Sequence, residues 1–149
     1  MNFFNFYINE VIKGTKQIDI KKIKKIENII LQTIFKDKQI FTCGNGGSAS
    51  VANHFLCDFN KGIKETSKKK IVPKIISLSS NIEILSAIAN DHNYKNVFRH
   101  QIENYANIGD CLLTLSCSGN SKNILEVTKL AKKKKLFIIS LTGFCKNNV

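Results

Sequence analysis

The chain has 149 residues, of which 43% are hydrophobic and 23% are charged, with a net charge of +12. This length suits one domain, and the composition excludes a disordered chain, a collagen and a small disulfide scaffold. No apolar run approaches the roughly 20 residues that span a bilayer, and the N-terminus lacks the features of a signal peptide. We therefore expect a cytoplasmic protein with no membrane partner.

The positive charge raises the question of a nucleic-acid partner. Lysine outnumbers arginine by 22 to 1, whereas contacts to bases and phosphates favour arginine. The lysine clusters also carry no interleaved aromatic residues. We interpret them as solvated helix faces and predict no nucleic-acid partner, with a weak acidic partner as the alternative.

The cysteine count is odd, and no C-x-x-C pair occurs. The five cysteines are Cys43, Cys57, Cys111, Cys117 and Cys145. This pattern predicts reduced cytosolic thiols and excludes a zinc ribbon.

The hydrophobic pattern predicts two helices, at 3–14 and 19–35, followed by an alternation of strands and helices. Asp19 is the expected N-cap of the second helix, and we expect the pair to pack on a sheet or on a partner subunit. Strands are predicted at 39–43, 74–78, 110–115 and 136–141. Helices are predicted at 49–59, 81–89, 94–105 and 124–134, and a lysine-rich loop at 61–70.

This alternation predicts an α/β fold, a doubly wound parallel sheet with flanking helices. We expect a single domain over 1–149, with a helical pair at 1–36 and an α/β core at 37–149. The sequence ends just after the fourth predicted strand, where such a sheet ordinarily continues. The core is therefore expected to be either small or truncated.

The string Gly44-Asn45-Gly46-Gly47-Ser48-Ala49, called the glycine string below, lies between a predicted strand and a predicted helix. Glycines let the backbone approach a ligand, and a helix N-terminus favours an anion. The string formally matches a dinucleotide fingerprint, but Ser79-Ser80 stand where that fingerprint expects an acid. A tight turn without a ligand is the other alternative.

The string Ser116-Cys117-Ser118-Gly119-Asn120-Ser121, called the serine string below, also lies between a strand and a helix. Its hydroxyls and the backbone amides at the helix start can form a phosphate cradle. A simple helix cap is the alternative. Both strings follow parallel strands, at the edge where open α/β sheets bind ligands. The sequence therefore predicts an anion site there.

Two further pairs are weaker signals. His54 and Asp58 lie four residues apart and share one helix face, so they suit two metal ligands, an acid/base pair or a surface hydrogen bond. Asn90-Asp91 by itself is most simply a turn in a loop between two helices.

Taken in order, these motifs resemble the phosphoheptose isomerases. That family of sugar isomerase (SIS) domain proteins converts sedoheptulose 7-phosphate to D-glycero-D-manno-heptose 7-phosphate for bacterial surface polysaccharides such as lipopolysaccharide or capsule. The resemblance runs from about Ile40 to Gly143, and the N-terminal helices also fit. It implies an enzyme, an aldose–ketose isomerase acting through an enediol proton shift, and a homotetramer.

The resemblance also implies residue roles. Asn45, Gly46 and Gly47 would contact a phosphosugar substrate. Asn90 and Asp91 would bind its hydroxyls. The phosphate would be held by Ser116, Cys117, Ser118 and Ser121. His54 and Asp58 would be zinc ligands, with Asp58 also the catalytic base.

The sequence departs from the family pattern in three ways. Asp58 stands where the family has Glu, and a misplacement of about 1 Å can cost roughly 100-fold in rate. Cys117 replaces the usual Thr at a helix start, where a thiol becomes more reactive. The family pattern continues with a strand and a helix whose Gln and His complete the zinc site, and this sequence ends before them. The alternative function is a non-catalytic phosphosugar-binding module or a protein adaptor.

Overall fold

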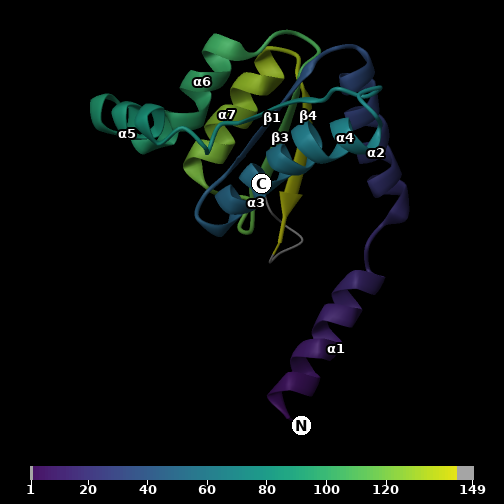
Figure 1. Cartoon of the computed structure of the whole chain (residues 1–149). Helices are drawn as coiled ribbons and strands as arrows, with labels where there is room; N and C mark the ends of the chain where they lie inside the picture. The colour runs from purple at the N-terminus through teal and green to yellow at the C-terminus, as the bar shows by residue number, and fades with distance from the viewer. Residues whose placement is uncertain (1, 144–149) are drawn as a thin grey trace.

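A parallel sheet of four strands lies at the centre of the protein (Figure 1). The computed structural model describes residues 2–143. The strand order is β2-β1-β3-β4. The strands are β1 (Gln39–Gly44), β2 (Lys74–Ser77), β3 (Cys111–Ser116) and β4 (Phe137–Thr142). In the register, Ile40 of β1 lies between Ile75 of β2 and Cys111 of β3. The predicted parallel α/β sheet is confirmed.

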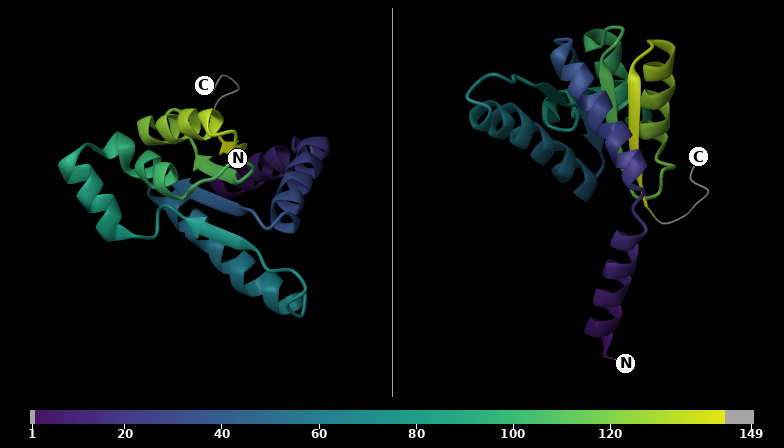
Figure 2. Two further views of the ribbon diagram at one scale, coloured as in Figure 1. Left: turned by 90° about the horizontal axis from the view of Figure 1, so that it is seen from above. Right: turned by 90° about the vertical axis from the view of Figure 1, so that its right-hand side faces the viewer.

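Helices cover both faces of this sheet, as predicted. On one face α2 (Ile20–Phe35) and α3 (Gly47–Cys57) pack over strand residues such as Ile40, Ile75 and Leu113. On the other face α5 (Ile82–Asp91), α6 (Val97–Tyr105) and α7 (Lys122–Lys133) pack over Phe41 and Leu112. Figure 2, right, shows α2 and α7 on opposite sides of β4. Successive strand residues point to opposite faces, so each strand contributes to both clusters.

The two N-terminal helices behave differently. Asp19 caps α2 as predicted, since its side chain accepts from the N–H groups of Lys21 and Lys22 at 2.9 and 3.3 Å. The α2 helix then packs on the sheet. By contrast, α1 (Phe3–Lys16) contains no buried residue and extends away from the sheet (Figure 1, and Figure 2, right). Neither α1 nor any other helix within residues 2–143 is long and apolar enough to cross a membrane.

The predicted lysine-rich loop at 61–70 is wrong in its first half. After α3 the chain continues as a π-helical turn, η1 (Asp58–Ile63), and a short helix, α4 (Lys64–Thr66). The Asn60 side chain donates to the C=O of Ile75 and accepts from its N–H, each at 2.9 Å. This amide satisfies the backbone of β2 and fastens the helical segment to the sheet, which the local lysine content does not reveal.

The expectation that Asn90 and Asp91 lie in a loop is also wrong. Both belong to the last turn of α5, which closes only where the N–H of His92 donates to the C=O of Ile88 at 3.1 Å. Ile88 is buried, so packing holds this last turn in helical form despite its polar composition. A short 3₁₀ turn, η2 (Tyr94–Asn96), then leads into α6.

Candidate active site

The glycine string and the serine string meet at the carboxyl ends of β1 and β3. These strands are neighbours, with Gly44 in register with Leu115. Together the two strings line a pocket of about 290 Å³. Its lining residues are Asn45, Ser48, Leu115, Ser116, Cys117, Ser118 and Ser121. The structure therefore brings together five of the residues for which the resemblance implied substrate contact, and adds Ser48 and Leu115.

Two glycines shape the first wall of the pocket. A Cβ on Gly44 would lie 2.6 Å from the backbone carbon and oxygen of Ser48, so only glycine lets α3 start this close to β1. Gly46, the N-cap of α3, has a φ of +52°, which glycine adopts without strain. Gly46 and Gly47 are exposed beside the pocket and are not among its lining residues.

The serine string forms the second wall and leaves hydroxyls available. Ser121 is the N-cap of α7, yet its side chain makes no capping hydrogen bond. Its Oγ lies instead 3.5 Å from Oγ of Ser116. Ser121 is therefore not a side-chain cap, while Ser118 Oγ accepts from the N–H of Asn120 at 3.2 Å. None of the seven lining residues carries a charged group, so an anion here would be held by neutral donors and the N-terminus of α7.

Asn45 is fixed by two residues that the sequence patterns did not single out. Its side-chain amide exchanges hydrogen bonds of 2.9 and 2.8 Å with Asn123, which is 3% exposed at the start of α7. The Tyr94 hydroxyl donates to Asn45 Oδ1 at 3.1 Å. Asn123 follows the serine string by two residues, but a single asparagine at a helix start is indistinguishable from an ordinary cap in the sequence.

His54 and Asp58 form an exposed pair on α3 and η1. His54 Nε2 lies 3.4 Å from Asp58 Oδ2, and their side chains are 75% and 59% exposed. Neither lines the pocket described above. Within one chain, this is the geometry of a surface pair one helical turn apart.

Asn90 and Asp91 also lie outside the pocket lining. Both are exposed, and Asn90 Nδ2 donates to Asp91 Oδ1 at 2.9 Å. Tyr94, three residues further, is the part of this region that reaches the glycine string. The structure thus links the region to the pocket through a different residue from the two that the resemblance implied.

The described residues do not make a zinc site by themselves. Within residues 2–143, no group of three or more His, Cys, Asp or Glu side chains is placed to share a metal ion. Protein zinc sites use four ligands, or three with an open position. His54 and Asp58 supply two donors, so the residues present do not fit a complete site.

The four described cysteines are free thiols, as predicted, and Cys145 lies outside the described residues. Burial raises the pKa of Cys43 far above its ordinary value. Burial and, secondarily, the charge of Asp110 raise the pKa of Cys111 to about 12. Cys57 and Cys117 are exposed, and Cys117 lines the pocket. Among the four described cysteines, Cys57 and Cys117 are therefore the thiols that solvent and reagents can reach.

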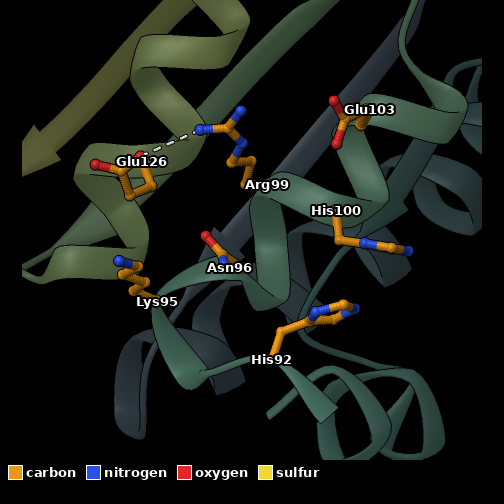
Figure 3. A pocket seen from close by; sticks show the side chains of 7 residues that line it. All are labelled: His92, Lys95, Asn96, Arg99, His100, Glu103 and Glu126. Atoms are coloured by element: carbon orange, nitrogen blue, oxygen red, sulfur yellow. Dashed lines mark hydrogen bonds and ion pairs between the residues drawn. The ribbon is translucent and has the colours of Figure 1, made fainter.

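A larger pocket, of about 410 Å³, opens between η2, α6 and α7 (Figure 3). Its carboxylate Glu126 is already paired, with Lys129 at 2.9 Å and Arg99 at 3.4 Å, and these partners hold its pKa below the usual range. The rings of His92 and His100 stack at a centroid distance of 5.9 Å. Because this larger pocket contains none of the motif residues, we place the candidate active site in the pocket between the two strings.

The SIS domain family matches residues 3–143, almost the whole described chain. The protein is thus a SIS domain protein. It is 40% identical over 121 residues to a phosphoheptose isomerase of Cytophaga hutchinsonii, covering 81% of this chain and 61% of that one. It is 35% identical over 147 residues to that of Clostridium acetobutylicum, covering 95% and 74%. Within the SIS domain proteins, the chain belongs to the phosphoheptose isomerase family.

Solved structures agree with this assignment. The structure of phosphoheptose isomerase GmhA from Neisseria gonorrhoeae superposes with a TM-score of 0.82 at 30% identity, covering 97% of this chain and 73% of that one. A phosphoheptose isomerase from Francisella tularensis shares the fold, with a TM-score of 0.86 at 24% identity over 95% of this chain and 74% of that one. The chain spans about 61% of the Cytophaga relative's length, so the activity of a whole isomerase is a proposal for this chain.

Proposed function

We propose that the chain is a phosphoheptose isomerase that interconverts sedoheptulose 7-phosphate and D-glycero-D-manno-heptose 7-phosphate. The observation that carries this proposal is the meeting of the glycine and serine strings in one uncharged, donor-rich pocket. The names of the relatives favour an isomerase over a binding module or an adaptor. A cytoplasmic location is part of the proposal, since the free thiols suit a reducing compartment.

The phosphate group would bind in this pocket. The hydroxyls of Ser116, Ser118 and Ser121 and the start of α7 supply neutral donors for its oxygens. The phosphate lies at the opposite end of the sugar from the reacting carbons. Its binding energy can therefore be used to hold C1 and C2 in place for the chemistry.

The isomerisation moves one proton from C1 to C2 through an enediol, while the hydroxyl proton on O1 leaves and one is added on O2. Asp58 is the proposed base that takes the C1 proton and returns it to C2. His54, 3.4 Å from the Asp58 carboxylate, can hold that carboxylate in place. The family resemblance implies zinc, which would polarise the sugar carbonyl. A bound zinc would need donors beyond His54 and Asp58.

The proposal includes a homo-oligomer, a tetramer by family resemblance. The apolar side chains of α1 expose 46% or more of their area, among them Phe3, Phe4, Phe6, Tyr7, Ile8 and Val11. A second copy that covers this surface would remove it from water. Light scattering coupled to size exclusion should give a mass of several chains. Phe6→Glu should lower that mass, whereas Lys16→Glu on the same helix serves as the control, and a monomeric wild type would contradict the oligomer.

The central experiment is to incubate the full chain with sedoheptulose 7-phosphate, with and without added zinc, and to follow the sugar by NMR. We expect the aldose signals to appear, and Asp58→Asn to abolish them. Asp37→Asn is the matched control, because Asp37 pairs with Lys74 at the surface. Absence of the aldose with wild type under both conditions would refute the isomerase, and broadened sugar signals would then indicate a phosphosugar-binding module.

A further inference from the structure

The reciprocal amide pair between Asn45 and Asn123 has only one possible orientation. Asn123 Oδ1 accepts from the backbone N–H of Ile124 at 3.0 Å. A backbone N–H cannot accept, so the Asn123 oxygen must be the atom facing it, and this settles which end of Asn123 is the NH₂ group. Asn45 must then present Nδ2 to Asn123 Oδ1 and its own Oδ1 to Asn123 Nδ2, at 2.9 and 2.8 Å.

The hydrogen-bonding capacity of Asn45 is then almost fully used. Its Oδ1 has two lone pairs, and these accept from Asn123 Nδ2 and from the Tyr94 hydroxyl. Its Nδ2 has two hydrogens, of which one goes to Asn123. Among the described residues no acceptor meets the second hydrogen, and Asn45 lines the pocket.

We propose that Asn123 and Tyr94 are positioning residues that lock the Asn45 amide so that it offers the pocket one N–H donor and no acceptor. The locked amide selects an oxygen acceptor, such as a phosphate or sugar oxygen, and disfavours a ligand N–H at that place. Burial strengthens the selection, since Asn123 is 3% exposed and water cannot easily replace its bonds. The kinetic part of this inference rests on the proposed isomerase function.

Two variants remove the lock at different points. Tyr94→Phe deletes only a hydroxyl from a ring that is 56% exposed, so it leaves the core intact. Asn123→Asp keeps the oxygen that Ile124 needs but places a second acceptor against Asn45 Oδ1. Because Asn123 is buried, Asn123→Asp can also lower the stability of the fold. The decisive variant is therefore Tyr94→Phe. Tyr105→Phe, a second half-exposed tyrosine at the end of α6, is the matched control.

The first readout needs no catalysis. In ¹H–¹⁵N spectra, wild type should show two well-separated Asn45 side-chain hydrogens that exchange slowly with water. In Tyr94→Phe their shifts should converge and their exchange should accelerate, and titration with inorganic phosphate should move them less than in wild type. Tyr105→Phe should match wild type. Unchanged Asn45 resonances in Tyr94→Phe would overturn the proposal, whatever the enzyme's activity.

The second readout compares the effect of Tyr94→Phe on KM with its effect on kcat. Losing one neutral hydrogen bond should raise KM for sedoheptulose 7-phosphate by about 2- to 10-fold in Tyr94→Phe, with kcat nearly unchanged. An unchanged KM with altered Asn45 resonances would overturn the role of the lock in ligand selection. An inactive wild type with the expected Asn45 resonances and phosphate response would refute the isomerase while supporting the lock.

Discussion

The Ser79 hydroxyl pairs with both backbone groups of Gly44. It accepts from the Gly44 N–H at 3.1 Å and donates to the Gly44 C=O at 3.0 Å. Ser79 lies two residues beyond the end of β2, so its side chain extends the pairing of β2 with β1 past the last strand residue. These two bonds hold the residue from which the glycine string departs.

Removing the Ser79 hydroxyl should destabilise the start of the glycine string, which forms one wall of the pocket. We expect Ser79→Ala to lower the free energy of unfolding by about 1–3 kcal/mol, because two buried backbone groups lose their partner. Urea unfolding measures this loss, and inorganic phosphate should bind more weakly in the same variant. Ser86→Ala is the control, since that hydroxyl bonds the Glu83 C=O on an exposed turn of α5. Equal effects of the two substitutions would contradict the role assigned to Ser79.

Gly44 itself should tolerate no side chain. In Gly44→Ala the new Cβ would meet the backbone of Ser48 at 2.6 Å, so α3 has to move away from β1. We expect a loss of about 1–3 kcal/mol in unfolding free energy, in the range measured for overpacked sites, together with weaker phosphate binding. Gly14→Ala in α1 meets nothing within 4 Å and should be neutral or stabilising by up to about 1 kcal/mol. A stable Gly44→Ala protein with normal phosphate binding would be inconsistent with the close approach.

The fold prediction rested mainly on hydrophobic periodicity and on the alternation of strands and helices along the chain. The isoleucine spacing of α2 and the Asp19 cap are local signals, and the structure shows both. The meeting of the two strings could also be predicted, because parallel strands end at the same edge of a sheet and each string directly follows a strand. Local chemistry and one topological rule were enough for these features.

The remaining features depend on contacts between distant residues. Asn60 bonds Ile75, and Asn45 bonds Asn123, across 15 and 78 positions of sequence. An asparagine that replaces a strand partner has the same sequence signature as one in a solvated loop, so the helical course of 58–66 and the Asn123 pair were not predictable. His54 and Asp58 share a helix face as their spacing predicted, but spacing alone does not say whether that face reaches the pocket.

The cysteines should separate into two classes by reactivity. With iodoacetamide at mildly alkaline pH, we expect Cys57 and Cys117 to be modified and Cys43 and Cys111 to stay unmodified, because burial both blocks access and raises their pKa values. Peptide mass mapping distinguishes the sites. Inorganic phosphate should protect Cys117, which lines the pocket, and leave Cys57 unprotected. Equal protection of both thiols, or of neither, would argue against phosphate binding at the serine string.

The ion pairs of Glu126 should make stability depend on pH in the acid range. The hydrogen bond from Lys129, followed by the contribution of Arg99, holds the pKa of Glu126 below its ordinary 4.5 in the folded chain. The unfolded chain therefore binds this proton more readily, so the stabilisation is complete above pH 4.5 and is lost as pH falls through the folded-state pKa.

Glu126→Gln removes that linkage. We expect the variant to be less stable than wild type at about pH 6. The difference in unfolding free energy should shrink as the pH falls below 4.5 toward the folded-state pKa of Glu126, because the unfolded wild-type chain takes up the proton first. The difference in unfolding free energy between wild type and Lys129→Gln should also shrink as the pH falls, since this substitution removes the largest cause of the lowered Glu126 pKa. Glu126 and its partners Lys129 and Arg99 are partly solvated. The loss of unfolding free energy in each of the two variants should therefore be small and should decrease with added salt. A Glu126→Gln difference that stays constant over this range would show that the carboxylate acts through packing and not through its charge.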